Sequence, residues 1–353
     1  MFIKTLRVEN FRNIKKAEIK PHPKLNFLYG LNGAGKTSLL EAIVVLARGK
    51  SFKTAYAEEL RGGETGAFRI FLESGHSGRS HKMGLERHGK SWKARKDGRD
   101  LSLLSELTRD LPLVLMEPNS HLLISGAPDG RRRFLDWGVF HVEPGFLDVW
   151  RRYSRALKQR NAALRDRQFR VLDSVDEVIS PLGEQLNALR LEYFAQLKAE
   201  FFNTAEMRVS AEIGEISMDY VAGWKGDSLL EALRQARKRD LERGASSQGP
   251  HRADMVLSRE GRQIRSWLSR GEQKSLAAVL LLTQARLLAA RGELPLLLLD
   301  DLASEFDPQH FRATLASALE CAGQVWVTGT LAPRFSADHK VFHVERGAVQ
   351  EMV

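Results

Sequence analysis

The chain has 353 residues, which exceeds one typical domain and favours two lobes. Its composition, 43% hydrophobic and 28% charged, is typical of a soluble globular protein. A single cysteine, Cys321, excludes a disulfide framework, argues against a structural zinc site and fits a reducing cytoplasm. The net charge of +10 favours polyanionic partners, with nucleic acid first and an anionic membrane surface second; a merely solvated basic surface is the alternative.

No segment of the sequence is typical of secretion or of a membrane span. Residues 1–7 lack the apolar core of a signal peptide. The longest apolar runs, 276–282 and 294–299, are far shorter than the ~20 residues that a membrane span needs. We therefore expect a soluble, cytoplasmic protein without a membrane partner.

The chain opens with short strands that lead into a glycine-rich loop. Strands are expected at 2–8, 14–19 and 25–29, and the third runs directly into the loop. Behind the loop, apolar residues recur at helical spacing, namely Leu39, Leu40, Ile43, Val44 and Ala47. Strand, glycine loop and helix in this order are the context that a phosphate-binding loop requires.

The loop itself, Gly30–Thr37, reads G-x-x-x-x-G-K-[ST] and predicts a site for ATP with Mg²⁺. Its glycines let backbone N–H groups turn inward around a phosphate, and the helix that follows adds a partial positive charge. We expect Lys36 to neutralise β- and γ-phosphate oxygens and Thr37 to hold Mg²⁺ through its hydroxyl. A chance glycine turn is the alternative.

The middle of the chain differs in composition from both ends. Further short strands are expected at 68–73, 82–87, 90–93 and 113–116. From about 144 to 243, stretches rich in Arg, Lys, Leu and Ala predict helices, with a candidate strand at 216–220. The residues expected to break this region, so that it is not one uninterrupted helical pair, are Pro181, Gly183, Gly214, Gly223 and Gly226.

Strands and helices alternate again after Gly249 and end in strands at 324–328 and 341–345. The sequence therefore predicts an ATPase lobe that is split by a helical insertion. The expected parts are 1–143 with the phosphate loop, 144–243 as the helical inserted lobe, and 244–353 as the second half of the ATPase lobe.

A second motif, Leu268–Gln273, precedes a helix expected from Lys274 to about Ala290. A serine hydroxyl at a helix N-terminus, with a glycine close by, suits contact with the γ-phosphate of a nucleotide held by another subunit. Such a contact would make ATP the link in a homodimer. By itself, Ser269 followed by Glu272 is also an ordinary capping box.

The third motif is an apolar strand at 294–299 that ends in Asp300 and Asp301. A carboxylate after a buried parallel strand lies where open α/β sheets bind ligands. We expect Asp300 to coordinate Mg²⁺ through water and Asp301 to orient or deprotonate the attacking water. Adjacent strand residues point to opposite faces, so both can serve only if the strand has already ended. A polar cap on an apolar strand is the alternative.

The order of these three motifs resembles the ABC-type ATPases of the SMC group and, more specifically, the RecF family of bacterial recombination mediators. The segments that carry the resemblance are Val8–Asn13, Tyr29–Ile43, Pro128–Asp136, Gly249–Asp254 and Asp300–Asp307. They span nearly the whole chain, and the two segments that generic ABC ATPases lack are Pro128–Asp136 and Gly249–Asp254. The resemblance implies an α/β fold: an ABC-type ATPase head, with a P-loop mixed sheet, helices and an antiparallel β subdomain, plus an inserted helical lobe.

By the same resemblance, Arg12 and Asn13 approach the nucleotide, and Ser304–Asp307 crosses a dimer interface. The full set of predicted nucleotide-binding residues is Arg12, Asn13, Gly30, Leu31, Asn32, Gly33, Ala34, Gly35, Lys36, Thr37, Ser38, Ser269, Gly271 and Gln273. The predicted metal ligands are Thr37 and Asp300, and the predicted catalytic residues are Lys36, Asp300 and Asp301.

The sequence departs from the wider ABC pattern at two positions. Asp301 stands where many members have Glu, and Thr328 follows the next strand where many have a histidine. Both departures indicate slow hydrolysis, suited to a timer. A residue equivalent to the Q-loop glutamine is best sought at Glu117–Asn119.

The resemblance implies a mediator of DNA repair that clamps duplex DNA near single-strand gaps as an ATP-dependent homodimer. Its implied role is recombinase loading in gap repair, replication restart and the SOS response, with RecR and RecO as partners. The charge runs 131–133 and 237–239 could contact DNA or merely solvate helices, and His251 with Arg252 could be functional or a simple turn. A transporter ATPase subunit, a scaffold with a degenerate ATP site and a small-molecule kinase are the other classes.

Overall fold

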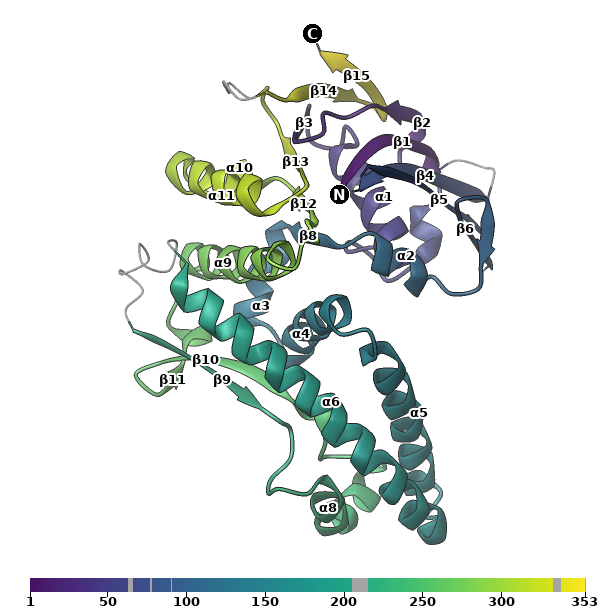
Figure 1. Cartoon of the computed structure of the whole chain (residues 1–353), viewed down its shortest axis with the longest axis vertical. Helices are drawn as coiled ribbons and strands as arrows, with labels where there is room; N and C mark the ends of the chain where they lie inside the picture. The colour runs from purple at the N-terminus through teal and green to yellow at the C-terminus, as the bar shows by residue number, and fades with distance from the viewer. Residues whose placement is uncertain (63–65, 77, 90, 205–214, 333–337, 353) are drawn as a thin grey trace. The chain divides into compact units, whose positions relative to one another are not determined.

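The computed structural model describes residues 1–62, 66–76, 78–89, 91–204, 215–332 and 338–352 (Figure 1). The chain divides into two compact units: unit 1 is Met1–Ser120 with Leu280–Val353, and unit 2 is His121–Val279. Unit 2 is thus an insertion between the two halves of unit 1, and it contains the whole of 144–243. Boundaries at 143/144 and 243/244 remain a sequence-based prediction.

One sheet of unit 1 is antiparallel throughout, in the order β2-β1-β4-β5-β6-β7. Its strands are β1 (Phe2–Phe11), β2 (Ile14–Ile19), β4 (Ala67–His76), β5 (Arg79–His88), β6 (Ser91–Lys96) and β7 (Arg99–Leu101). Alternating apolar residues face the core, such as Leu6 and Val8 on β1 and Ile70 and Leu72 on β4. The antiparallel β subdomain expected from the sequence is confirmed.

The second sheet of unit 1 is mixed, in the order β15-β14-β3-β13-β12-β8. Its strands are β3 (Leu25–Tyr29), β8 (Leu113–Met116), β12 (Leu296–Leu299), β13 (Gln324–Gly329), β14 (Lys340–Glu345) and β15 (Ala348–Met352). All neighbouring pairs are parallel except β14 with β15. Parallel pairing brings the carboxyl ends of β3, β13, β12 and β8 to one edge, where Asp300 follows β12 and Glu117 follows β8.

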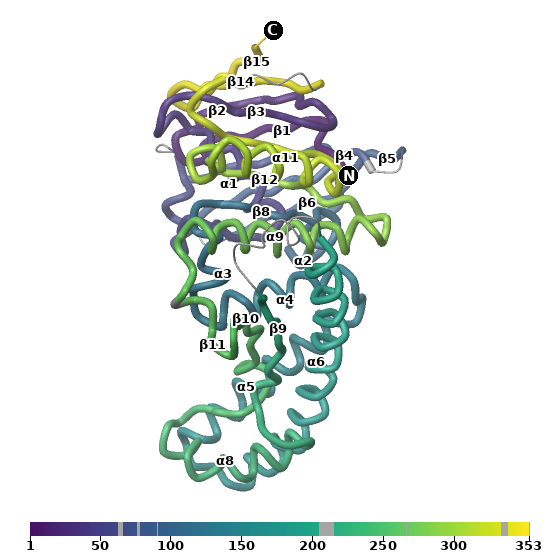
Figure 2. The backbone as a smooth tube through the Cα atoms, turned by 90° about the vertical axis from the view of Figure 1, so that its left-hand side faces the viewer, coloured from purple at the N-terminus to yellow at the C-terminus, as the bar shows by residue number. Residues whose placement is uncertain are grey.

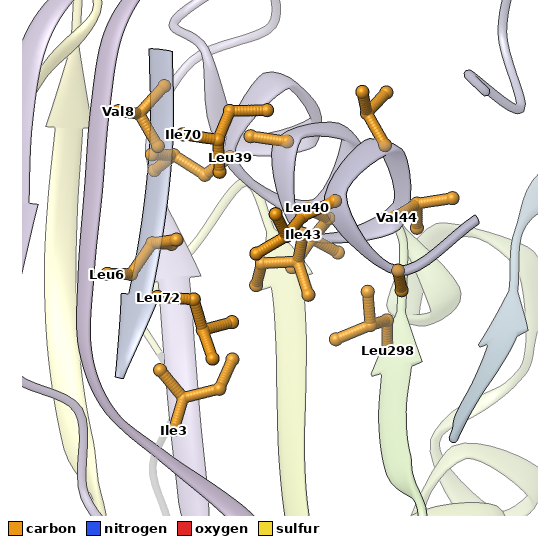
Figure 3. Packing of buried hydrophobic residues seen from close by; sticks show 14 of the residues in the cluster. Ile3, Leu6, Val8, Leu39, Leu40, Ile43, Val44, Ile70, Leu72 and Leu298 are labelled. Atoms are coloured by element: carbon orange, nitrogen blue, oxygen red, sulfur yellow. The ribbon is translucent and has the colours of Figure 1, made fainter. Parts of the chain in front are cut away.

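Helix α1 (Lys36–Arg48) packs between these two sheets, as Figure 3 shows. Its apolar stripe, including Leu39, Leu40 and Ile43, is buried against side chains of β1 and β4 on one side and of β12 on the other. The phosphate loop is therefore fixed at both ends, by a central strand and by the most buried helix of the unit. The other helical segments of unit 1 are η1 (Ala57–Leu60), α2 (Ser105–Asp110), α10 (Leu302–Glu305) and α11 (Pro308–Cys321).

Unit 2 is mostly helical (Figure 1). Its helices are α3 (Leu122–Ser125), α4 (Pro128–Val142), α5 (Phe146–Arg165), α6 (Phe169–Asn203) and α8 (Leu229–Arg243), with short η4 (Pro250–Arg252) and η5 (Ile264–Ser266). A small antiparallel sheet consists of β9 (Ile216–Val221), β10 (Asp254–Arg259) and β11 (Arg262–Gln263). Segment η2 (Pro118–His121) spans the first boundary between the units, and α9 (Arg270–Ala289) begins in unit 2 and ends in unit 1.

The structure confirms the predicted interruptions of the helical region only in part. The candidate strand at 216–220 is confirmed as β9, which extends to Val221. Gly223 and Gly226 lie in the connection between β9 and α8, and Gly214 lies outside the described residues. Pro181 and Gly183 do not end a helix, because both lie within α6. Proline costs ~3 kcal/mol inside a helix, and packing of α6 against α5 and α8 offsets it. A Cβ at Gly183 would lie 2.3 Å from Leu229 Cδ2, so a larger residue there would require the Leu229 side chain of α8 to shift.

Within the part of the chain that the structure describes, no helix has both the length and the apolar character that a membrane crossing requires.

Candidate nucleotide-binding site

The phosphate loop runs from the end of β3 to the start of α1. Gly30 has φ 154, and a Cβ there would lie 2.2 Å from the Val344 carbonyl oxygen, so only glycine fits. Gly35, with φ 118, is the N-cap of α1. Leu31–Gly33 is exposed and Ala34–Lys36 is buried, while Thr37 and Ser38 are half-buried. The chain thus forms the tight, glycine-dependent turn into a helix that phosphate binding needs.

Lys36 is 7% exposed and lies inside the loop that precedes it. Its Nζ donates hydrogen bonds to the carbonyl oxygens of Gly30 at 2.7 Å and Leu31 at 2.9 Å. Burial lowers the pKa of Lys36, and the negative charges of Asp301 and then Asp300 oppose that shift. The loop therefore holds a buried cation close to both carboxylates.

Asp300 joins the loop to the neighbouring strands of the sheet. Its Oδ1 accepts hydrogen bonds from Thr37 Oγ1 and from Thr328 Oγ1, each at 2.9 Å. Asp300 is 3% exposed; burial raises the pKa of its carboxyl, and the hydroxyls of Thr328 and Thr37 oppose this. Segments 263 residues apart in the sequence thus share one buried carboxylate.

Asp301 follows β12 in the left-handed region, with φ 53 and ψ 29, and is the N-cap position of α10. Because β12 ends at Leu299, the alternation of strand residues no longer applies, and both carboxylates can serve one site. A non-glycine residue in this conformation costs ~1–2 kcal/mol. The backbone N–H of Asp301 donates to Thr328 Oγ1 at 2.7 Å, which helps to hold the turn.

The donor set at this carboxylate fits Mg²⁺. Among the described residues, no group of three or more His, Cys, Asp or Glu could hold a metal ion by itself. Mg²⁺ prefers hard oxygen ligands and commonly takes only one or two carboxylates, with substrate phosphates supplying the rest. The Thr37 hydroxyl and the Asp300 carboxylate are such ligands and lie in contact at 2.9 Å.

The β1–β2 turn reaches the loop through Asn13, whose Nδ2 donates to the Gly33 carbonyl at 3.1 Å. The side chain of Arg12 is directed to α1 and its surroundings. Its Nε and Nη2 donate to Glu41 at 2.9 and 2.7 Å, and its Nη1 donates to the Glu59 carbonyl at 2.9 Å. Of the two turn residues, Asn13 touches the loop, whereas the role of Arg12 toward a nucleotide stays a prediction.

Two further residues flank the site. Glu117 follows β8 as Asp300 follows β12, since Met116 pairs with Leu299. Burial raises the pKa of Glu117 to about 7, the charge of Asp300 adds to the shift, and Arg48 opposes it. Gly347, in the β14–β15 turn, donates its N–H to the Ala34 carbonyl at 2.7 Å. Sequence reasoning missed Gly347; the only signal was a glycine between two short strands.

The signature Leu268–Gln273 belongs to unit 2, whereas the phosphate loop and both aspartates belong to unit 1. The Ser269 N–H donates to Glu272 Oε2 at 2.7 Å and the Glu272 N–H to Ser269 Oγ at 3.3 Å, so the capping box is present. Gln273 Nε2 donates to the Leu268 carbonyl at 2.9 Å. Helix α9 begins at Arg270, earlier than expected, and Ser269 and Gly271 are exposed.

The two segments that generic ABC ATPases lack come together within unit 2. Arg131 forms a bidentate pair with Asp254 at 2.7 and 3.0 Å, and Arg132 donates to the Ala253 carbonyl at 2.8 Å. Arg190 connects them again, with Asp136 at 2.7 Å and the Pro250 carbonyl at 2.7 Å. These contacts engage the guanidinium groups of Arg131 and Arg132 within unit 2 and favour a structural role for both residues. The third residue of the charge run, Arg133, is 66% exposed and pairs with Asp129.

A buried polar network continues from that junction. Arg160, 0% exposed, contacts Asp176 at 2.6 Å and both Asp240 and Ser246 at 2.8 Å. His251 lies between Tyr153 OH at 2.7 Å and the Ser246 carbonyl at 3.0 Å. Burial lowers the pKa of His251 to about 4, although the Ser246 carbonyl opposes the shift. These contacts favour a structural role for His251.

The sequence pattern of the RecF/RecN/SMC N terminal domain matches residues 2–350. The protein named DNA replication and repair protein RecF from Xanthomonas euvesicatoria pv. vesicatoria (strain 85-10) is 41% identical over 362 residues, covering 99% of this chain and 98% of the relative. This chain belongs to the RecF family. A RecF of the same name from Stenotrophomonas maltophilia (strain R551-3) is 41% identical over 359 residues, with coverage of 99% and 98%.

Solved structures agree with the RecF assignment. The recombination mediator protein RecF-ATPrS in the RecFOR pathway matches with a TM-score of 0.88 and 25% identity, covering 100% of this chain and 98% of that one. An SMC head bound to the C-winged helix domain of ScpA matches with a TM-score of 0.58 and 13% identity, covering 100% and 97%, and shows the fold alone. The predicted ABC-type ATPase head, a P-loop mixed sheet with an antiparallel β subdomain, is confirmed.

Proposed function

We propose that this chain is an ATP-dependent, DNA-binding recombination mediator of the RecF type. The observation that carries the ATP part is the hydrogen bond between Thr37 of the phosphate loop and Asp300 after β12, at 2.9 Å. It unites two of the three sequence motifs in one buried site of unit 1. The names of the full-length relatives, DNA replication and repair proteins, support the wider role.

In the proposed ATPase, the residues of the site have different roles. Lys36 binds phosphate oxygens with a buried ammonium group that is already held within the loop. Thr37 and Asp300 hold Mg²⁺, which would supply charge neutralisation at the phosphates. Asp301 orients the attacking water or accepts its proton. The remaining phosphate contacts come from backbone N–H groups of the loop and from the N-terminus of α1.

We further propose that hydrolysis is slow and acts as a switch. The Asp301 carboxylate is one methylene shorter than the Glu of many ABC ATPases. Thr328, near the end of β13, stands where many ABC ATPases have a histidine, so no imidazole acts there. Both differences reduce the means of activating water, while the groups that bind phosphate are intact.

The dimer part of the proposal rests on the exposed signature. Ser269 and Gly271 are exposed at the N-terminus of the 20-residue helix α9. In a homodimer, Ser269 of one copy would contact the nucleotide held by Lys36 and Thr37 of the other. Two ATP molecules would then hold the dimer together, and hydrolysis would release it.

The DNA part of the proposal rests on charge and on the relatives. A net charge of +10 suits a polyanion, and phosphate contacts supply most of the affinity in such complexes. The dimer would clamp duplex DNA near single-strand gaps and help to load the recombinase, in the cytoplasm. RecR and RecO would be its partners in gap repair, replication restart and the SOS response.

Replacing Lys36 by alanine tests the nucleotide site. Loss of a charged donor to phosphate removes about 3 kcal/mol, so we expect ATP affinity to fall by at least about 100-fold. Equilibrium binding of a fluorescent ATP analogue measures the change. Lys93→Ala, at an exposed lysine of β6 in the same unit, is the matched control and keeps full affinity. Unchanged ATP affinity in Lys36→Ala would remove the assigned role of the loop.

A further inference from the structure

Thr328 lies at the point where β13 meets both aspartates. Its side chain is 1% exposed, and its Oγ1 donates to Asp300 Oδ1 at 2.9 Å while accepting the Asp301 N–H at 2.7 Å. One hydroxyl thus contacts the carboxylate of the first aspartate and the backbone of the second.

The sheet register explains why this residue occupies that place. β12 and β13 are parallel neighbours, with Leu299 paired to Val327, so Thr328 and Asp300 follow the paired ends of the two strands. A threonine fits here because its branched side chain is compatible with a strand and still carries a hydroxyl. The hydroxyl donates its one hydrogen to Asp300 and accepts a hydrogen bond from Asp301 on one of its lone pairs.

The second contact matters because Asp301 has an unfavourable backbone conformation. Its φ of 53 lies in the left-handed region, which residues with a Cβ enter at a cost. The hydrogen bond from its N–H to Thr328 Oγ1 stabilises this turn, and the turn determines where the Asp301 side chain begins. Loss of the hydroxyl would release the turn and leave a part-buried N–H without this partner.

A purely structural explanation of the Thr328 hydrogen bonds also exists, since buried hydroxyls are usually hydrogen-bonded to some partner. For that purpose a hydrogen bond to a nearby backbone carbonyl would be enough. Ser180 Oγ, for example, donates to the Asp176 carbonyl one helical turn away, at 2.7 Å. Thr328 instead contacts two successive residues that are both predicted to act in hydrolysis. Asp300 links Thr328 to the phosphate loop, because Asp300 Oδ1 also accepts a hydrogen bond from the Thr37 hydroxyl.

We infer that Thr328 is a positioning residue for ATP hydrolysis, and this inference rests on the proposed ATPase function. Its hydroxyl orients the Asp300 carboxylate and fixes the turn at Asp301, so that the second carboxylate is presented to the water in one orientation. Among the described residues, the two hydrogen bonds of the Thr328 hydroxyl go to Asp300 and Asp301 rather than to Lys36 or the glycine turn. Its loss should therefore reduce kcat and leave ATP affinity nearly unchanged.

The test compares Thr328→Val, which removes the hydroxyl at nearly constant shape, with Thr328→Ser, which keeps it. We expect kcat of Thr328→Val to fall about tenfold, the loss of one oriented hydrogen bond in the transition state, with the ATP Kd within about twofold of wild type. Thr328→Ser should recover most of the rate. Thr314→Val, a buried hydroxyl on α11 in the same unit, is the matched control and should keep the wild-type kcat.

The outcomes separate this inference from the ATPase proposal. If wild type hydrolyses ATP, Asp301→Asn is slow and Thr328→Val equals wild type, the inference is wrong and the proposed function stands. If wild type itself shows no hydrolysis, the proposed function is wrong. Should Thr328→Val melt well below wild type, the pair Thr328→Ser and Thr328→Ala isolates the hydroxyl. Faster hydrolysis by the serine variant supports the inference, and equal rates overturn it.

Discussion

Asp301 shows how one residue can set the geometry of a site. A regular strand would send Asp300 and Asp301 to opposite faces, but the chain leaves β12 after Leu299 and turns left-handed at Asp301. The ~1–2 kcal/mol cost of that conformation is acceptable where the surroundings hold it. Thr328 supplies one such contact, and the charge of Asp301 acts on buried Lys36. We therefore propose that the local strain at this position serves the predicted site rather than the stability of the fold.

His251 provides a pH prediction at the same scale. Burial lowers its pKa to about 4, whereas an unfolded histidine titrates near pH 6.5. The unfolded chain therefore binds the proton first as the pH falls. The resulting stability is fully present above about pH 6.5 and is lost as the pH falls toward 4, by about 3 kcal/mol in total. Urea unfolding of wild type and His251→Gln measures it.

The prediction concerns the difference in unfolding free energy between wild type and His251→Gln, because other groups also titrate in acid. The unfolding free energy of wild type should exceed that of His251→Gln most at neutral pH, and the gap should narrow toward pH 4. His88→Gln, at an exposed position of β5, is the control and should leave the pH profile as it is. A gap that stays constant with pH would contradict the assigned burial effect.

Sequence alone found the residues with a strong local pattern. The glycine-lysine-threonine loop and the aspartates after an apolar run are recognisable because phosphate binding and sheet edges demand those residues at those spacings. The sequence singled out Thr328 only as standing in place of a histidine; its contacts with Asp300 and Asp301 depend on the register of β12 with β13. The pairing of Arg131 with Asp254 also joins residues 123 apart, so a charge run that could have faced DNA is partly structural.

At the scale of elements, the C-terminal hairpin supports the phosphate loop. β14 pairs with β3, which leads into the loop, and β15 lies beside β2 in unit 1 (Figure 2). Gly347 in the hairpin turn donates to the Ala34 carbonyl at 2.7 Å. A Cβ at Gly347 would lie 2.2 Å from the Asn13 carbonyl oxygen. The two turns therefore pack directly on each other next to the loop.

Gly347→Ala should weaken ATP binding even though Gly347 need not touch ATP. The new Cβ would push the hairpin from the β1–β2 turn and disturb the bond to Ala34; we expect about a tenfold rise in the ATP Kd. Gly98→Ala is the matched control, because Gly98 has φ 82, close to the φ 81 of Gly347, with no atom within 4 Å of its added Cβ. Both variants share the left-handed strain. Equal ATP affinity in the two would show that the hairpin does not support the loop.

Most elements of the fold were predictable for physical reasons that are local. Short apolar strands such as Leu113–Met116 and the helix after the loop follow from periodicity and from flanking turn residues. Pro181 and Gly183 show the limit of that reasoning, because tertiary packing keeps α6 helical through both. Strand order was likewise beyond local pattern: β3 lies between β13 and β14, which are far away in the sequence.

At the scale of the whole molecule, the predicted sites fall on both units. The phosphate loop and the aspartates belong to unit 1, and the signature belongs to unit 2, which is inserted between the halves of unit 1. An ATP-dependent dimer would use both units of each copy. Its DNA affinity should fall steeply with salt, because each neutralised phosphate releases counterions.

We propose that ATP joins two copies through Ser269 and that the dimer binds DNA. Fluorescence anisotropy of a labelled gapped duplex, with and without Mg·ATP, measures the DNA binding, and light scattering measures the mass of the complex. Ser269→Arg blocks the exposed signature, and Ser174→Arg on exposed α6 surface is the matched control. We expect wild type and Ser174→Arg to dimerise and bind only with ATP, and Ser269→Arg to do neither. DNA binding that ignores ATP, with Ser269→Arg equal to wild type, would contradict the claim.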